Sequence, residues 1–112
     1  MKYSILIISI LLSAAKAESI VFVADDFKAE VVYEKERMTS KECLNISDCF
    51  TFPNSLKFYS NQNPLFSLCY QSKGTPRFGH INKVKITGCI NSNNKVVDLN
   101  SLMKAYKMVN PK

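Results

Sequence analysis

The sequence predicts a small, disulfide-stabilised α+β domain in which short helices pack on antiparallel hairpins. Three observations predict this class. A length of 112 residues allows one domain, the 4 cysteines form an even set in a short chain, and strand-like alternation is interrupted by two helical patterns. A hydrophobic fraction of 46%, with 3 glycines and 4 prolines, excludes a disordered or collagen-like polymer.

The first residues, 1–17, have the pattern of a secretory signal peptide. Lys2 precedes an apolar run from Ser4 to Ala14, and Ala15-Lys16-Ala17 places small residues where a signal peptidase cuts. The run is shorter than the ~20 residues that span a bilayer. We therefore expect a single exported domain over 18–112, secreted or periplasmic, with no transmembrane segment in the mature chain.

The exported domain is predicted to open with a hairpin. Residues 19–24 are β-branched and aromatic, Asp25-Asp26 supplies a turn, and residues 28–35 alternate apolar and charged side chains. A helix over 30–37 is the alternative. Residues 38–60 show no sustained period, so we expect a surface connection with short extended pieces at 49–52 and 56–59.

A helix is predicted over 64–73. Asn63 suits the N-cap because its side-chain oxygen can accept from the first-turn N–H groups, and Pro64 suits the next position because its missing N–H costs nothing there. Gly74 stands where a helix would end in a left-handed residue. A turn containing Gly74, Pro76 and Gly79 is expected to follow.

A second hairpin and a last helix complete the domain. Residues 81–90 alternate, which places Val84 and Ile86 toward the core and Lys83 and Lys85 on the opposite face. The Asn-rich residues 91–94 form a turn, and 95–99 return as a strand. Asp98 or Asn100 could cap the final helix, whose apolar stripe consists of Leu99, Leu102, Met103 and Tyr106.

The cysteines of an exported chain are expected to form two disulfides. Cys43, Cys49, Cys69 and Cys89 allow three connectivities, and we favour Cys43–Cys49 with Cys69–Cys89 because a helix lying on the hairpin brings the last two together. A zinc site is disfavoured because the ligand pairs of such sites are usually two to four residues apart. No metal and no cofactor are predicted.

Residues 63–107 resemble a small exported bacterial domain family of unknown function, some members of which carry a haemolysin label. The resemblance rests on Asn63-Pro64, Cys69, Gly74, Gly88-Cys89 and the Asn93-Asn94 turn before a closing helix. The chain departs from the family pattern at three places. The family has two glycines at Lys73-Gly74, a further cysteine at Val97 and a tryptophan near Asn100. The resemblance implies a helix packed on a hairpin and transfers no catalytic residue.

Charge is divided unequally along the chain. Residues 18–48 carry eight acids and four bases, whereas 49–112 carry nine bases and one acid. Such asymmetry indicates either two halves that attract each other or a basic surface for an anionic partner. The candidate anionic-partner face consists of Lys73, Arg77, Lys83, Lys85 and Lys95, with Tyr70 and Phe78 nearby. If these lysines only solubilise the domain, the partner site is expected among Phe50, Phe52, Phe58 and Tyr59.

Residues suited to catalysis are few. His80, in a predicted loop, could act as a general acid or base, but the sequence has no G-x-S-x-G or H-E-x-x-H motif. Asp25-Asp26 is better explained as a turn than as a pair of catalytic carboxylates. No catalytic residue is therefore predicted, and an enzyme is the less favoured class.

The sequence thus favours a non-catalytic exported binding or interaction module of the cell envelope or secreted fraction. Its partner would be a protein, a glycan or an anionic envelope component, and nucleic acid is disfavoured by the exported location. The alternatives are a small exported enzyme using His80 and a structural or accessory envelope protein. Asn45-Ile46-Ser47 is a glycosylation sequon, which matters only in a eukaryotic secretory pathway.

Overall fold

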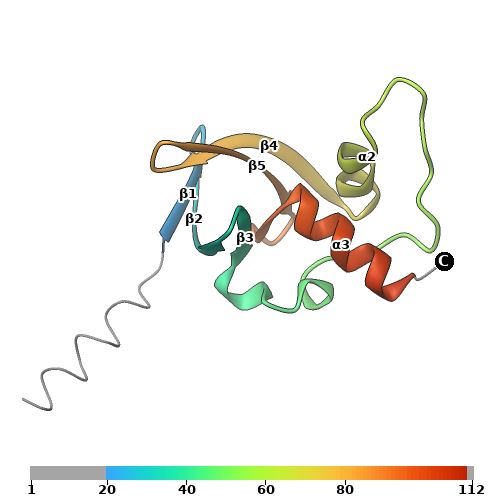
Figure 1. The fold of residues 1–112 in the computed structure, drawn as a ribbon, viewed down its shortest axis with the longest axis horizontal. Helices are drawn as coiled ribbons and strands as arrows, with labels where there is room; N and C mark the ends of the chain where they lie inside the picture. Colours follow the sequence, from blue (N-terminus) through green and yellow to red (C-terminus); the bar gives the residue numbers. More distant parts are fainter. Residues whose placement is uncertain (1–19, 111–112) are drawn as a thin grey trace, which may run out of the picture.

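The structure is a computed structural model that describes residues 20–110, so the predicted signal peptide lies outside the described residues. Within them, six strands close into an antiparallel barrel in the order β1-β2-β3-β6-β5-β4 (Figure 1). The predicted α+β class is confirmed. The elements in chain order are β1 (Ile20–Ala24), β2 (Phe27–Glu34), β3 (Arg37–Ser40), η1 (Lys41–Cys43), η2 (Ile46–Asp48), α2 (Pro64–Gln71), β4 (Gly74–Ile81), β5 (Val84–Asn91), β6 (Val96–Asp98) and α3 (Leu99–Val109).

The barrel is assembled from two meanders, β1-β2-β3 and β4-β5-β6, that meet at two narrow seams. At the first seam β1 pairs with β4 at Phe22↔Ile81 and Val23↔His80. At the second seam β3 pairs with β6 at Thr39↔Val97. Side chains extend this second seam, because Asp98 Oδ1 accepts from the backbone N–H of Met38 at 2.8 Å. On the other side, Ser40 Oγ accepts from the N–H of Val96 at 2.8 Å.

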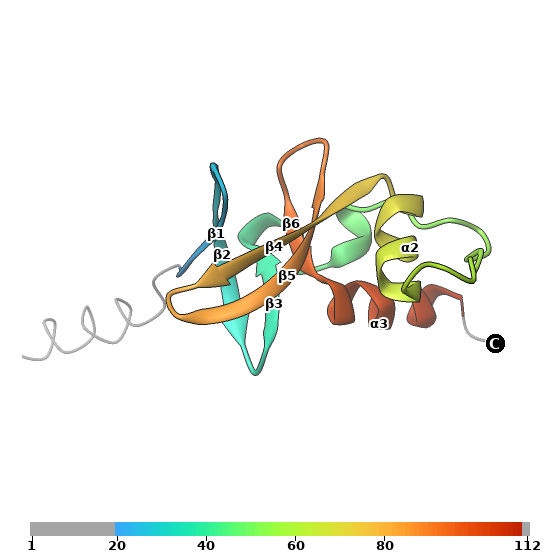
Figure 2. The ribbon, with the colours of Figure 1, turned by 90° about the horizontal axis from the view of Figure 1, so that it is seen from above.

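Two hydrophobic cores share the β5–β6 sheet. One fills the barrel, and the other lies between the helices and the outer face of the sheet. Figure 2 shows α2 and α3 together on one side of the strands. Val96 belongs to the barrel core and its neighbour Val97 to the helical core. Since both faces of β6 are covered, all three of its residues are buried.

The predicted helix at 64–73 is confirmed, with a shorter end. Asn63 Oδ1 accepts from the N–H of Leu65 at 2.8 Å, and Pro64 occupies the first helical position. The left-handed residue is Lys73, at φ 66°, and not Gly74 as expected. Gly74 instead starts β4, where an added Cβ would lie 2.4 Å from Cys89 Sγ.

The final helix is also confirmed, and Asp98 is its cap. The second carboxylate oxygen of Asp98 accepts from the N–H of Ser101 at 3.0 Å. Leu99 and Leu102 of the predicted stripe are buried, and Met103 and Tyr106 pack against the same core. One carboxylate therefore caps α3 and bonds to β3.

The predicted turn at Gly74–Gly79 is wrong, because these residues belong to strand β4. The strand predicted over 81–90 is β5, and the two strands are joined at Asn82-Lys83. Pro76 is tolerated because this part of β4 pairs with β5 alone, as at a sheet edge. An added Cβ at Gly79 would lie 2.4 Å from the carbonyl oxygen of Val23.

The first hairpin is confirmed, and residues 30–37 are not the alternative helix: they form the end of β2, a turn at Lys35-Glu36 and the first residue of β3. The segment 38–60, expected to be a surface connection with short extended pieces, differs from this expectation in two ways. It begins with strand β3, and the extended pieces expected at 49–52 and 56–59 form no strands. The second piece is instead held by side chains. The N–H of Leu56 donates to Tyr106 Oη at 2.8 Å, and Gln71 bonds to both backbone groups of Lys57.

Both disulfides have the favoured connectivity. Cys43–Cys49 joins residues 6 apart and clips η1 to the residue after η2. Cys69–Cys89 joins residues 20 apart and ties α2 to β5. Two disulfides in so small a domain fit an extracellular or otherwise oxidising compartment.

Candidate functional site

A groove of about 1410 Å³ lies along the β4–β5 hairpin. The start of α2 forms one wall, the start of α3 another, and the turn between β2 and β3 reaches its edge. The groove exists because α2 covers only part of the hairpin: Cys69–Cys89 fixes the helix near one end of β5, and the other end projects beyond it (Figure 2).

Phe78 is the main apolar feature of this groove. Its side chain is 74% exposed although it lies on a regular strand. One edge contact holds it, a T-shaped arrangement with Phe66 of α2 at 6.0 Å between ring centroids. Leu65 of α2 extends the apolar lining beside this pair. Ile86 also borders the groove, but it packs against the barrel core, on the hairpin face opposite to Phe78. The groove is therefore lined by aromatic and aliphatic side chains that water reaches.

Two lysines stand at the hairpin end of the groove. Lys83 lies in the β4–β5 turn and Lys85 on β5; both are exposed, line the groove and make no ion pair among residues 20–110. Val84, expected to face the core, is 47% exposed because it lies beyond the end of the barrel core. This end of the groove therefore combines positive charge with exposed apolar surface.

Two carboxylates also line the groove. Glu36 is exposed in the β2–β3 turn, at φ 67°. Asp98 is 3% exposed, and its two oxygens accept the N–H groups of Met38 and Ser101. Because the Asp98 oxygens already hold backbone donors, Glu36 is the carboxylate that a ligand in this groove would meet.

His80 lies on β4 and not in a loop, which corrects the predicted setting. It lines the groove, and its Nδ1 donates to the Asn82 carbonyl at 2.9 Å. Within the described part of the chain, no hydrogen bond joins the ring to a hydroxyl or carboxylate that could form a catalytic pair. The same residues hold no cluster of metal-ligating side chains.

The predicted anionic-partner face is divided by the structure into three places. Lys83 and Lys85 line the groove, whereas Lys73 and Arg77 line a separate pocket of about 430 Å³ beside the β1–β2 turn. In that pocket Arg77 lies 3.6 Å from Asp25. The five residues therefore do not form one continuous face.

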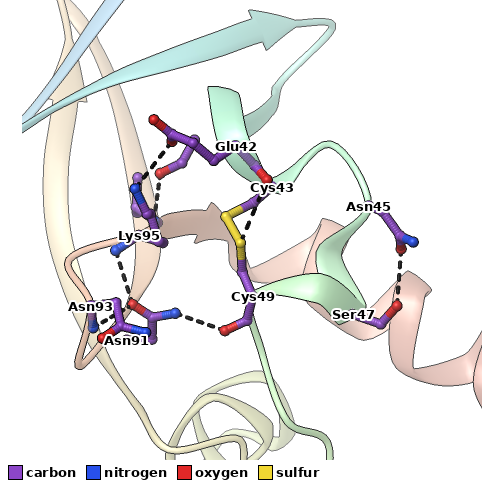
Figure 3. The surroundings of a disulfide bond; sticks show 10 residues. Glu42, Cys43, Asn45, Ser47, Cys49, Asn91, Asn93 and Lys95 are labelled. Carbon is purple, nitrogen blue, oxygen red and sulfur yellow. Dashed lines mark hydrogen bonds and ion pairs between the residues drawn. A yellow bond between two sulfur atoms is a disulfide. The ribbon is translucent and has the colours of Figure 1, made fainter.

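Lys95 occupies the third place, beside the Cys43–Cys49 clip (Figure 3). Its Nζ lies 3.3 Å from Glu42 Oε1. The backbone N–H of Glu42 and the Lys95 ammonium together hold the pKa of the Glu42 carboxyl below its usual value. Asn91 completes the cluster, since its amide donates to the Cys49 carbonyl at 2.8 Å and accepts from the N–H of Lys95 at 2.9 Å. Lys95 is thus held by Glu42 and Asn91 beside the Cys43–Cys49 disulfide.

The second predicted cluster, of aromatic residues, is also divided. Phe50 is buried in the helical core, and Phe52 packs against Tyr106 at 5.9 Å between centroids. Phe58 and Tyr59 are exposed, and neither lines the groove. The sequon residues Asn45 and Ser47 are exposed as well, and the Ser47 hydroxyl donates to Asn45 Oδ1 at 2.9 Å (Figure 3).

Sequence analysis identified Phe78, Lys83 and Lys85 but missed the walls of the groove. Leu65 and Phe66 are apolar residues of the first helical turn, one or two positions away from the buried Ser67 and Leu68. Their incomplete burial has no local signal, because it depends on how far the hairpin extends beyond α2. Glu36 and Tyr33 reach the groove only because the barrel closes.

Over residues 20–110 no helix is long and apolar enough to cross a membrane. The resemblance of residues 63–107 to an exported bacterial family remains a prediction. Compared with family models, with curated proteins and with solved structures, the chain has no match.

Proposed function

We propose that this protein is a non-catalytic binding module whose groove takes an extended segment of a partner protein bearing apolar and acidic side chains. The observation that carries the proposal is Phe78, which is 74% exposed in a groove with two lysines at one end. Aromatic side chains that are rigid, central and accessible commonly dominate binding energy at protein interfaces. The proposal includes export of the protein, so that it would meet its partner in the cell envelope or in the secreted fraction.

The apolar part of the partner would lie on the floor and wall of the groove. Phe78 and Phe66 already form an edge-to-face pair, so a third apolar side chain can pack beside them without reordering the groove. Leu65 would be covered at the same time. Burial of this surface is favourable by about 25 cal/mol per Å² before the costs of association.

The acidic part of the partner would lie at the hairpin end. Lys83 and Lys85 are exposed and have no ion-pair partner among the described residues. Glu36, at the opposite hairpin, would repel an acid placed beside it and so favours one orientation of the segment. A hydrolytic role for His80 has less support, because the groove supplies it with no hydroxyl or carboxylate partner among residues 20–110.

Selection of random peptides on the oxidised protein tests the proposal. We expect selected peptides to combine Asp or Glu with Phe, Tyr or Leu. Phe78→Ala should weaken their binding by about tenfold or more, as for an interface hot spot. Phe58→Ala is the matched control, because Phe58 is 70% exposed and lies outside the groove. It should leave binding unchanged.

Two double charge-reversal variants, one inside the groove and one outside it, complete the experiment. Lys83→Glu with Lys85→Glu should abolish selection of acidic peptides, whereas Lys104→Glu with Lys107→Glu changes net charge equally outside the groove and should not. Peptides without acidic enrichment, or equal losses in variant and control, would contradict the proposal. Capture of anionic glycan in place of peptides would assign the groove to a different partner class.

A further inference from the structure

The pocket of about 430 Å³ beside the β1–β2 turn is an open end of the barrel. Its lining comes from three segments, residues 26–27, 73–77 and 90–94, and we call it the barrel-mouth pocket. Among residues 20–110, β1 pairs with β4 at Phe22↔Ile81 and Val23↔His80 alone, so the start of β4 pairs only with β5. Figure 2 shows the β1–β2 and β5–β6 turns rising on the same side of the barrel. Barrel mouths are frequent ligand sites, and pockets of ~300–1,000 Å³ take small molecules.

The floor of the barrel-mouth pocket is apolar and already ordered. Phe27 and Ile90 line it, and both are half-buried and pack against the barrel core. Phe27 is held by a T-shaped contact with Phe22, at 6.3 Å between ring centroids. A ligand with an apolar face would therefore meet a surface that needs no reordering.

One wall of the pocket carries two cations. Lys73 precedes β4 and Arg77 lies on it, and both are exposed. Lys73 makes no ion pair among the described residues. Arg77 Nη1 lies 3.6 Å from Asp25 Oδ2, which is longer than a hydrogen bond, and the two side chains are 45% and 82% exposed. Such an exposed pair holds its partners weakly, so the guanidinium donors stay available to a ligand.

The rim of the pocket adds neutral and acidic hydrogen-bonding groups. Thr75 and Ser92 supply hydroxyls, Asn94 an amide and Asp26 a carboxylate, and all four residues are exposed. Thr75 lies directly opposite the floor residue Ile90 in the β4–β5 pairing, so polar and apolar groups meet on one face of the hairpin. The ligand must therefore offer hydroxyl groups as well as negative charge.

We propose that the barrel-mouth pocket binds a short segment of an acidic polysaccharide built from hexuronic acid units. The C–H face of a sugar ring would lie on Phe27 and Ile90, its hydroxyls would bond to the rim, and carboxylates would pair with Lys73 and Arg77. These two residues are four positions apart, a spacing of about 13 Å along an extended chain, which suits carboxylates repeated along a polymer. A free phosphate would leave the floor uncovered, and a fatty acid would leave the rim groups without hydrogen bonds.

The inference is independent of the proposed function, because the barrel-mouth pocket and the groove share no residue. Arg77 and Phe78 are consecutive in β4, so their side chains point to opposite faces of the strand. The protein could therefore hold a polysaccharide and a partner segment at the same time, and separate variants can test each site.

Titration of the oxidised protein with defined oligosaccharides, followed by NMR, tests the proposal. The probes are the trimers of galacturonate and of mannuronate, their fully methyl-esterified forms, citrate and inorganic phosphate. We expect at least one trimer to bind and to shift the backbone amide signals of residues 73–77 and 90–94. Its methyl ester, which keeps the sugar and loses the charge, should bind at least tenfold more weakly, as should citrate and phosphate, which lack the sugar.

Three variants locate the contacts. Lys73→Gly and Arg77→Gln should each weaken binding of the trimer about fivefold, and Thr75→Val, which removes one hydroxyl, about threefold. Glycine suits the left-handed position of Lys73, at φ 66°, so the loss in Lys73→Gly cannot come from a weakened fold. The midpoint of urea unfolding verifies this for each variant.

Each variant has a matched control outside the barrel-mouth pocket. Lys57→Gly and Lys85→Gln remove the same charge as Lys73→Gly and Arg77→Gln, and Thr87→Val removes a hydroxyl from the groove side of the hairpin. All three controls should bind the trimer like wild type.

Four outcomes would overturn the inference: no binding of either trimer, equal binding of trimer and ester, binding of citrate or phosphate as tightly as the trimer, and equal losses in variants and controls. If peptides bind in the groove while neither trimer binds, the proposed function stands and the polysaccharide site is excluded. If a trimer binds while no peptides are selected, the reverse conclusion follows.

Discussion

Asp98 joins a strand and a helix through one buried carboxylate. One oxygen holds the N–H of Met38 across the β3–β6 seam, and the other holds the N–H of Ser101 in the first turn of α3. Backbone pairing between β3 and β6 consists of Thr39↔Val97, so much of the seam depends on this side chain and on Ser40. A carboxylate suits the position because it accepts two hydrogen bonds and presents no donor.

The variant Asp98→Asn is therefore expected to destabilise the domain although its shape is conserved. The amide nitrogen would face a backbone N–H, leaving a buried donor unpaired at a cost of about 1–3 kcal/mol. The midpoint of urea unfolding measures the loss. Asp48→Asn, on the exposed 3₁₀ turn, is the control and should change the midpoint little; equal midpoints for the two variants would refute the role of Asp98.

Lys73 lies in the left-handed region, at φ 66°, between α2 and β4. A residue other than glycine is strained there, because its Cβ crowds the backbone at positive φ. Lys73→Gly should raise the free energy of unfolding by up to about 1 kcal/mol. Lys57→Gly, in a loop without this φ, is the comparison and should not stabilise. A lower stability of Lys73→Gly would contradict this account of the turn.

At the scale of elements, the two disulfides constrain rings of different size. Cys43–Cys49 closes a small ring that contains η2, and Cys69–Cys89 closes a ring of the last residues of α2, β4 and most of β5. Loop-closure entropy grows with the logarithm of ring length, so the bridges should differ in their contribution to stability.

Removing the larger ring by Cys69→Ser with Cys89→Ser should cost about 1 kcal/mol more than removing the smaller by Cys43→Ser with Cys49→Ser. Separations of 20 and 6 residues set this difference, and the buried position of Cys69 and Cys89 adds to it. Urea unfolding of the two double variants gives the comparison. A greater loss from the small ring would mean that the clip stabilises by contacts rather than by ring closure.

Elements with a strong local signal were predictable from the sequence, and those that depend on distant partners were not. Asn63-Pro64 and Asp98 specify helix starts through hydrogen bonds within one turn. Strand β4 was missed because Gly74, Pro76 and Gly79 have the composition of a turn. In the structure the two glycines leave room for the Cys89 sulfur and for the Val23 carbonyl oxygen, and Pro76 stands where β4 is a sheet edge. Barrel closure was not predicted because its seams join residues about 60 positions apart.

In the candidate site, too, residues with a local signal were predictable and their grouping by distant contacts was not. Lys83, Lys85 and Phe78 could be identified because exposed charge and aromatic residues stand out in the sequence. Their separation from Lys73, Arg77 and Lys95 could not, because it depends on which acidic residues the barrel brings beside each base.

For the whole molecule, the uneven charge has a structural counterpart. Among the described residues, all acids except Asp98 lie in the first meander or in the 3₁₀ turns η1 and η2 that follow it. The ion pairs Arg77–Asp25 and Lys95–Glu42 both run from the second meander to this first half of the chain. The interpretation as two mutually attracting halves therefore applies to part of the charge, and the two lysines of the groove are left for partners.

Binding in the groove should accordingly depend on salt. At half-molar salt the screening length is about 4 Å, so wild-type binding of an acidic peptide should fall, and the Lys83→Glu, Lys85→Glu variant should not show this decrease. Fluorescence anisotropy at two salt concentrations gives both results. Binding that survives both the charge reversal and high salt would mean that these lysines are only a solvated face.

The long loop before α2 divides the covalent structure of the protein in two. One disulfide lies wholly before residues 54–62 and the other wholly after them, so no bridge spans the loop. A single proteolytic nick there would leave two fragments, each with three strands and one disulfide, held together by the barrel seams and the helical core. The nicked protein would behave as a split protein: its fragments would separate in urea without reductant and reassemble when the urea is diluted.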